Sequence, residues 1–212
     1  ILKSEDGNIF WIMDNNKNTL ATKNENGYRI CKPYQNKIAA SIINGLEILP
    51  IIKKNKFLFL EYPMGLSVTH VSDMIGNEGK CFMVLPPDTI DNKLSRIFQK
   101  HNNIITISNK FDEPEKFPLD TKVDVVYVDL IQLNYIEIAL KNSRFHLKDC
   151  GYLMIIIETK KISVNLDGTY PSDNTLRDKI QKDFDIIQEI NLTDFFKNYT
   201  LFISKKRIIS SN

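Results

Sequence analysis

The sequence has few of the residues from which metal sites and disulfide frameworks are built. It contains 3 cysteines and 3 histidines among 212 residues. Cys31, Cys81 and Cys150 lie far apart and form no CxxC pair. We therefore expect no zinc site, and we expect the cysteines to remain reduced in an intracellular compartment.

The sequence also lacks long apolar runs and a strong charge of one sign. No apolar run approaches the roughly 20 residues that cross a bilayer, and no signal-peptide pattern is found. We therefore expect neither a membrane-spanning helix nor a signal peptide in this sequence. The formal net charge is +2 at pH 7, whereas a domain that holds RNA by electrostatics alone is normally more basic. If RNA is the target, we expect other subunits to supply much of the binding.

The length fits one main domain with a small appendage. Short β-like runs separated by turn residues predict a small antiparallel unit over 1–33, which Pro33 closes. A helix is predicted from Gln35, because Ile38, Ile42 and Leu46 recur at helical spacing.

Apolar strands and helices then alternate along the chain. Strands are predicted at 57–60, 81–85, 104–107, 123–128 and 152–157, and helices at 66–75, 89–100, 135–145 and 174–182. This alternation indicates a parallel sheet covered on both faces. The runs at 186–190 and 200–203 leave no room for a crossover helix, so we expect an antiparallel hairpin at one sheet edge. We assign 34–207 to this α/β domain and 208–212 to a tail.

The stretch 57–73 reads as a buried strand, a tight loop and a helix, the layout in which nucleotide-type cofactors are bound. It resembles the fibrillarin family of box C/D RNA-guided 2′-O-methyltransferases, whose loop Gly-Ala-Ala-Ser-Gly-Thr-Thr precedes Ser-His-Val-Ser-Asp. The helix half is kept as Thr-His-Val-Ser-Asp over 69–73. The glycine half instead reads Glu-Tyr-Pro-Met over 61–64.

Three further stretches resemble the family in the same order, namely 36–42, 123–132 and 191–202. The resemblance extends from about Ile9 to Lys205. It implies a class I methyltransferase (Rossmann-like) α/β fold, with a seven-stranded mixed sheet and a C-terminal antiparallel hairpin beside the small N-terminal β unit.

The resemblance implies a site for S-adenosylmethionine in the loop, where glycines let the backbone approach the ligand. Here Glu61 stands at the first glycine, and its charge opposes the cofactor's carboxylate. Pro63 removes a backbone donor, and Tyr62 and Met64 are expected to fill the cavity. The retained cofactor-binding positions are Gly65, Ser67 and Gln132.

Two more cofactor positions are substituted. By resemblance, Leu85 replaces an acidic residue that holds the ribose hydroxyls, and Lys110 replaces an Asp that accepts from the adenine amino group. An ammonium has donors only. Each lost polar contact costs roughly 1–3 kcal/mol, so affinity should fall at least about a thousandfold. The loop is then a plain strand–helix turn. The alternatives are a weakened cofactor site or a site for a different small ligand, with Lys110 facing an anionic group.

Family enzymes place Lys, Asp, Lys and His around the acceptor 2′-hydroxyl, to orient it and to draw off its proton. By resemblance, Lys37 and Asp129 are retained, whereas Glu158 replaces the second Lys and Tyr199 replaces the His. Lys37 and Asp129 form either a catalytic pair or an ion pair that ties a helix to the sheet. Glu158 is expected beside Asp129, where two carboxylates raise each other's pKa and would allow a new acid–base pair. Tyr199 is expected to be a strand-edge aromatic residue.

Partners follow from the same resemblance. The best RNA-contact candidates are Lys160, Lys161 and Lys197. The implied partners are guide RNA or pre-rRNA, a Nop-family scaffold protein and, as a further candidate, an active fibrillarin copy. The expected location is the nucleolus for a eukaryotic source or the cytoplasm for an archaeal one.

Three hypotheses result. The first, which we adopt as the prediction, is a fibrillarin-like pseudo-methyltransferase that binds no cofactor and serves pre-rRNA processing as an RNA- or protein-binding module. The second is an active S-adenosylmethionine-dependent rRNA 2′-O-methyltransferase whose loop rearranges on assembly and whose activity depends on Lys37 and Asp129. The third is a methyltransferase fold recruited to another ribonucleoprotein as an interaction domain.

Overall fold

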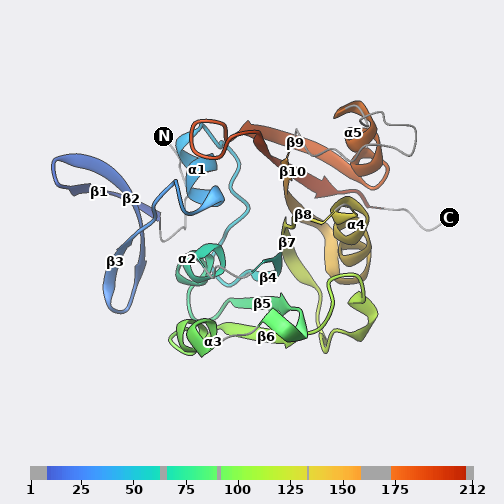
Figure 1. Ribbon diagram of the computed structural model, residues 1–212, viewed down its shortest axis with the longest axis horizontal. Helices are drawn as coiled ribbons and strands as arrows, with labels where there is room; N and C mark the ends of the chain where they lie inside the picture. Colours follow the sequence, from blue (N-terminus) through green and yellow to red (C-terminus); the bar gives the residue numbers. More distant parts are fainter. Residues whose placement is uncertain (1–8, 63–65, 90–91, 133, 159–172, 209–212) are drawn as a thin grey trace.

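The computed structural model describes residues 9–62, 66–89, 92–132, 134–158 and 173–208. Its strands form a three-stranded sheet and a seven-stranded sheet. The small sheet stands to one side of the helices that cover one face of the large sheet (Figure 1). No helix in the described ranges is long and apolar enough to cross a membrane.

The small sheet is an antiparallel meander of β1 (Ile9–Asp14), β2 (Lys17–Asn24) and β3 (Gly27–Ile30). Its first turn places Asn15 and Asn16 at φ angles of 47° and 62°. Asparagine tolerates this left-handed region, which tight hairpin turns require. The predicted N-terminal antiparallel unit is thus confirmed.

The large sheet has the strand order β6-β5-β4-β7-β8-β10-β9. Neighbouring strands from β6 to β8 run parallel, whereas β10 runs antiparallel to both β8 and β9. The predicted mixed sheet with its C-terminal hairpin is therefore confirmed. The strand bounds are β4 (Lys56–Glu61), β5 (Lys80–Leu85), β6 (Ile104–Ser108), β7 (Val123–Asp129), β8 (Leu147–Glu158), β9 (Phe184–Asn191) and β10 (Tyr199–Lys206).

The α-helices are α1 (Lys37–Ile43), α2 (Leu66–Ile75), α3 (Asn92–Phe98), α4 (Tyr135–His146) and α5 (Asp173–Gln181), and short 3₁₀ turns occupy Pro87–Thr89 and Pro114–Lys116. The first helix begins later than predicted from Gln35. The Asn36 side chain accepts hydrogen bonds from the backbone N–H groups of Ile38 and Ala39 at 2.9 and 3.1 Å, so it caps the helix. Gly45, at φ 92°, follows the helix, which leaves Leu46 buried but outside it.

The two faces of the large sheet bury separate apolar clusters. Phe57 and Phe59 of β4 face α1 and α2, whereas Leu58 and Leu60 face α4 and α5. Because side chains alternate along a strand, the last residue of β4, Glu61, turns toward the face that α1 and α2 cover. This alternation decides which side chains meet at the carboxyl edge of the sheet.

Candidate active site at the carboxyl edge of the sheet

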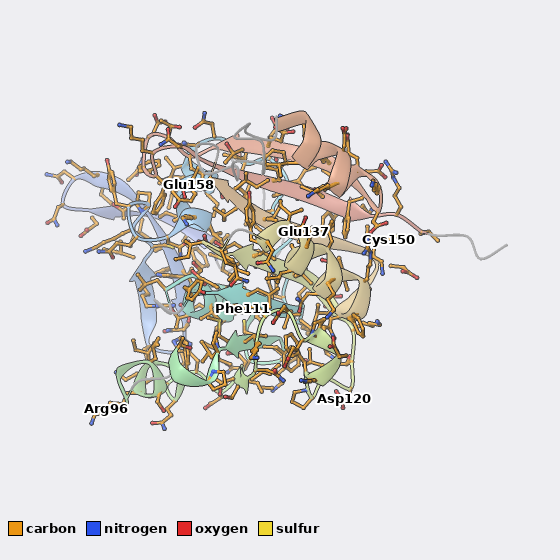
Figure 2. The ribbon with its side chains drawn as sticks, turned by 45° about the vertical axis from the view of Figure 1, so that its right-hand side comes forward. Arg96, Phe111, Asp120, Glu137, Cys150 and Glu158 are labelled. Atoms are coloured by element: carbon orange, nitrogen blue, oxygen red, sulfur yellow. The ribbon has the colours of Figure 1, made fainter. Side chains whose placement is uncertain are left out.

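Four strands that are neighbours in the sheet meet at one edge with polar residues at their ends. Glu61 ends β4 opposite Asp129, which ends β7. Glu158 ends β8 opposite Tyr199, which begins β10. The structure thus brings together the four candidate catalytic residues, which are Lys37, Asp129, Glu158 and Tyr199. It also places Glu61 beside them. Figure 2 draws Glu158 at this edge.

Lys37, the first residue of α1, is held on the Asp129 carboxylate. Its Nζ lies 2.7 Å from Oδ1 and 2.8 Å from Oδ2. The same ammonium lies 4.2 Å from the ring centroid of Tyr199 and 5.6 Å from that of Phe196. Burial raises the pKa of Asp129, and the Lys37 ammonium opposes that rise. The ion pair therefore ties α1 to the sheet, whatever further role it has.

Glu158 is engaged by Tyr199. The Tyr199 hydroxyl donates a hydrogen bond to Glu158 Oε2 at 3.2 Å. Burial, and next the Glu158 carboxylate, raise the pKa of Tyr199 to about 12. Tyr199 therefore remains protonated near neutral pH and holds Glu158 while its ring covers Lys37.

Glu61 is a buried carboxyl group, only 7% exposed. Ser67 Oγ donates to its Oε1 at 2.9 Å, but Oε2 has no hydrogen-bond partner among the described residues. Burial, and next the Asp129 charge, raise the pKa of Glu61 from 4.5 to about 8. Glu61 is thus a carboxyl beside Asp129, where the sequence analysis did not place it, and it lies there because β4 and β7 are neighbouring parallel strands.

Tyr127 lies beneath these groups, two residues before Asp129 on β7. Its ring is fully buried, and its hydroxyl has no hydrogen-bond partner in the described part of the chain. Burial raises the pKa of Tyr127 well above its ordinary value, and the charges of Asp129 and Glu61 add to this rise. The neighbouring Ser67 acts in the opposite direction and lowers the pKa of Tyr127. The proton of the Ser67 hydroxyl is itself donated to Glu61. We refer to Lys37, Glu61, Ser67, Tyr127 and Asp129 as the Glu61 cluster.

The remaining cofactor positions are spread along the same edge. Leu85 is fully buried in the apolar core, so it presents no group to a ribose. Lys110 and Gln132 line a cavity of about 340 Å³ together with Tyr62. Tyr62 is 37% exposed and lines this cavity, and its ring packs edge-to-face on Phe111 at 5.6 Å.

Several predicted residues lie outside the described ranges. These are Pro63, Met64, Gly65, Lys160 and Lys161. Lys197 is described and exposed, in the connection between β9 and β10. Among the described residues, no group of histidine, cysteine, aspartate and glutamate side chains is arranged to hold a metal ion.

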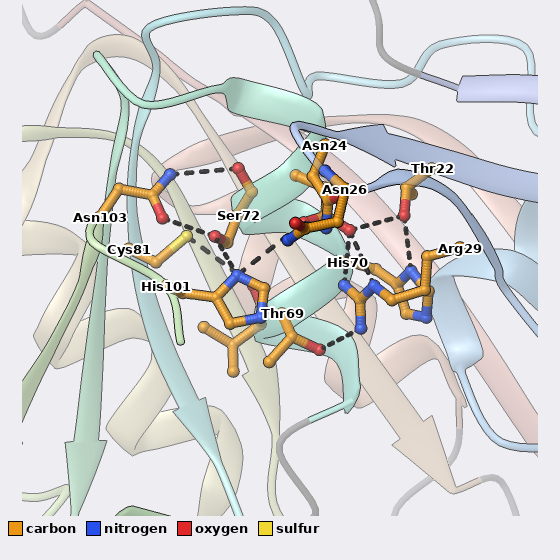
Figure 3. Close-up of polar contacts among 12 residues, drawn as sticks. Thr22, Asn24, Asn26, Arg29, Thr69, His70, Ser72, Cys81, His101 and Asn103 are labelled. Carbon is orange, nitrogen blue, oxygen red and sulfur yellow. Dashed lines mark hydrogen bonds and ion pairs between the residues drawn. The ribbon is translucent and has the colours of Figure 1, made fainter. Parts of the chain in front are cut away.

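A second polar cluster, which we call the Asp73 cluster, was missed by the sequence reasoning (Figure 3). The side chain of Asp73 on α2 accepts from Arg29 Nε and Nη2 at 2.9 and 2.6 Å and from Thr22 Oγ1 at 2.7 Å. Asn24 adds a longer bond of 3.3 Å. The donors come from β2 and β3, so the cluster fastens the small sheet to α2.

Neighbouring side chains on α2 extend the Asp73 cluster. His70 Nδ1 lies 2.9 Å from Thr22 Oγ1 and, because that hydroxyl donates to Asp73, the imidazole is the donor. Burial, and next the Arg29 charge, lower the pKa of His70 to about 4. Ser72 donates to Asn103 at 2.5 Å. The Thr-His-Val-Ser-Asp run thus joins α2 to its neighbours. The concentration of polar residues on a helix expected to be buried was the sequence feature that could have predicted this cluster.

A model of the family described as Fibrillarin matches residues 8–208. The chain belongs to the fibrillarin family. It is 32% identical over 180 residues to the fibrillarin-like rRNA/tRNA 2′-O-methyltransferase of Pyrococcus furiosus, an alignment that covers 84% of this chain and 79% of that protein. The recognition made from the sequence is confirmed.

Solved fibrillarins share the fold. The Methanococcus jannaschii fibrillarin pre-rRNA processing protein aligns with TM-score 0.83 and 27% identity, over 95% of this chain and 98% of that one. Aeropyrum pernix fibrillarin, solved with natively bound S-adenosyl-L-methionine, aligns with TM-score 0.81 and 23% identity, over 93% and 94%. The fibrillarin of a fibrillarin/Nop5p complex aligns with TM-score 0.78 and 24% identity, over 94% and 97%.

The fibrillarin fold implies S-adenosylmethionine, and the residues present here do not fit it. The first glycine of the loop is replaced by the Glu61 carboxyl, which lies against Asp129 and leaves one oxygen unsatisfied. The ribose position holds a buried Leu85, and the adenine position holds the donor-only Lys110. This disagreement concerns the contacts that the family resemblance assigns to the carboxylate, the ribose and the adenine of the cofactor.

Proposed function

We propose that this fibrillarin-family chain is a component of a box C/D ribonucleoprotein that serves pre-rRNA processing by binding RNA and protein, without transferring methyl groups. The observation that carries the proposal is the buried Glu61 carboxyl at the base of the cofactor loop. If Glu61 is ionised, it repels the carboxylate of S-adenosylmethionine. If Glu61 is protonated, it still fills the space that a glycine leaves for the ligand.

The acceptor side of the site supports the same conclusion. Methyl transfer to a ribose hydroxyl needs a positioned hydroxyl and a group that takes its proton. Both oxygens of Asp129 are engaged by Lys37, and the position of the second family lysine carries Glu158, which accepts from Tyr199. A carboxylate there opposes an approaching phosphodiester rather than attracting it.

Partner binding is the function that remains. The solved fibrillarin/Nop5p complex provides the precedent for a Nop-family scaffold protein as the partner. Guide RNA or pre-rRNA would contact Lys160, Lys161 and Lys197 through phosphates, as the family resemblance implies. With a net charge of only +2, the chain depends on the scaffold for part of its RNA affinity.

One observation favours the alternative, an active S-adenosylmethionine-dependent rRNA 2′-O-methyltransferase. Lys37 and Asp129 stand at the family positions that the resemblance assigns, and Lys37 Nζ lies 2.7 Å from Asp129 Oδ1. Half of the catalytic set is therefore assembled. For activity, Glu61 would have to leave its buried position when the particle assembles.

Reconstitution separates the two functions. The chain is mixed with a guide RNA, its target RNA and a Nop-family scaffold, and both particle assembly and transfer of labelled methyl groups are measured. We expect assembly without transfer. Charge reversal at Lys160, Lys161 and Lys197 should weaken assembly steeply at low salt, whereas the matched reversal at the exposed Lys53 and Lys54 should not. Methyl transfer above background would favour the alternative.

A further inference from the structure

The cavity of about 340 Å³ at the carboxyl edge has no occupant in the proposed function. Its lining comes from the loops that follow β4, β5, β6 and β7, and the strand order reverses between β4 and β7. Ligands of open α/β sheets bind at such a reversal, beyond the carboxyl ends of the strands. The volume also lies within the range of small-molecule pockets.

One wall of the cavity is aromatic. Tyr62 presents an exposed ring and is braced edge-to-face by the buried Phe111, at a centroid distance of 5.6 Å and an interplanar angle of 74°. Figure 2 labels Phe111 in the loop after β6. A ring that is held in this way offers a surface on which a planar base can stack.

The loop that carries Phe111 is pinned by the main chain and by α4. Asn109 N–H donates to the Leu85 carbonyl at 3.0 Å. Lys141 Nζ donates to the Asp112 carbonyl at 2.7 Å, and Asn142 Nδ2 donates to the Phe111 carbonyl at 2.8 Å. The backbone of the loop is therefore fixed before any ligand arrives.

Two charged side chains of this pinned loop line the cavity. Lys110 and Asp112 are both exposed, and within the described residues neither head group has a hydrogen bond or ion pair. The Lys110 ammonium only donates, and the Asp112 carboxylate only accepts. A donor and an acceptor therefore line the same cavity as the Tyr62 ring.

We propose that this cavity recognises a guanine base, stacked on Tyr62, with Lys110 donating to O6 and the Asp112 carboxylate accepting from the N1–H and N2–H groups. Lysine to guanine O6 or N7 is a preferred pairing, and a carboxylate accepts two parallel N–H groups well. Adenine in the same orientation fits poorly, because its amino group would face the Lys110 ammonium and its N1 and C2 positions carry no N–H group to donate to Asp112. Gln132 and Asn134, which also line the cavity, are available to the sugar.

The guanine can belong to a free nucleoside or to an unstacked residue of an RNA, since both present the same edge. The inference rests on the proposed function in one respect, which is that S-adenosylmethionine does not occupy this space. The experiment therefore includes the cofactor as a separate ligand.

Guanosine, inosine, adenosine and S-adenosylmethionine are titrated into the full chain by calorimetry, alongside single-stranded RNA octamers that differ only by guanine or adenine at one position. We expect guanosine, or the guanine octamer, to bind at least about a hundredfold tighter than its adenine counterpart. Inosine lacks the N2 amino group and should bind about tenfold weaker than guanosine. Binding of guanosine identifies a free nucleoside as a source of the guanine, whereas binding of the octamer alone identifies RNA as the source.

Asp112→Asn should remove the guanine preference, whereas Asp120→Asn, at an exposed carboxylate outside the cavity, should keep it. Both sites are exposed, so folding is not at risk. Equal binding of adenine and guanine ligands, an unchanged preference in Asp112→Asn, or no base-dependent binding at millimolar ligand would overturn this inference alone. Tight S-adenosylmethionine binding would overturn the proposed function and, with it, the premise of this inference.

Discussion

The Asp73 cluster and the Glu61 cluster are both buried groups of polar side chains, yet their hydrogen bonding differs. Asp73 receives donors from Thr22, Asn24 and Arg29. Glu61 receives one donor on one oxygen, and the Tyr127 hydroxyl beside it has no partner among the described residues. Buried polar atoms without partners are uncommon and cost free energy.

The Asp73 cluster, with its many hydrogen bonds, stabilises the fold, whereas the Glu61 cluster contains buried polar atoms that cost stability. The Asp73 cluster joins the small sheet to α2, so its loss would release an element. Within the Glu61 cluster, Glu61 stands where the family resemblance places a glycine, and the unsatisfied atoms of the cluster are typical of a site in which stability is not optimised. Substitutions in the two clusters should therefore act in opposite directions.

The largest effect at a fixed pH is expected for Arg29→Met in the Asp73 cluster. The change removes the Arg29 guanidinium from the nearly inaccessible Asp73 carboxylate, and breaking a buried pair from one side costs about 3 kcal/mol. Urea unfolding measures the loss. Lys23→Met, at an exposed cation on the neighbouring strand, should stay within about 0.5 kcal/mol. A loss below 1 kcal/mol for Arg29→Met would mean that the small sheet is held by other contacts.

The next effect is a pH dependence that Glu61→Gln should abolish. The folded pKa of Glu61, about 8, exceeds the ordinary 4.5, so the folded state binds the proton more tightly than the unfolded state does. This contribution to stability is complete below about pH 4.5 and is lost as pH rises toward 8, with a slope of up to ~1.4 kcal/mol per pH unit. The unfolding free energies of the unmodified chain and of Glu61→Gln, measured between about pH 4.5 and pH 8, give the contribution of Glu61. Parallel profiles would show that Glu61 titrates normally.

The smallest effect is expected for Tyr127→Phe, which removes an unpartnered buried hydroxyl. Its unfolding free energy should stay the same or rise by about 1 kcal/mol. Ser41→Ala is the matched control, because that buried hydroxyl donates to the Ile38 carbonyl at 2.7 Å and its loss should cost about 1 kcal/mol. If Tyr127→Phe is the more damaging change, its hydroxyl has a partner after all.

Local pattern was sufficient for most of the fold. Apolar runs predicted β4 and β5 within one residue, and α2 was predicted at 66–75, its observed bounds. Contacts between distant segments were not predictable in this way. Glu61 meets Asp129 only because β4 lies beside β7, and Arg29 reaches Asp73 across 44 residues. The cavity beside Tyr62 likewise depends on how the Phe111 loop is pinned by α4.

The most direct test is calorimetric titration of S-adenosylmethionine and S-adenosylhomocysteine into the purified chain. Aeropyrum pernix fibrillarin, which was solved with natively bound S-adenosyl-L-methionine, serves as the positive control in the same buffer. We predict no binding at millimolar ligand, because Glu61, Leu85 and Lys110 each oppose a different part of the cofactor. Micromolar binding would contradict this account and would make the active methyltransferase the better description.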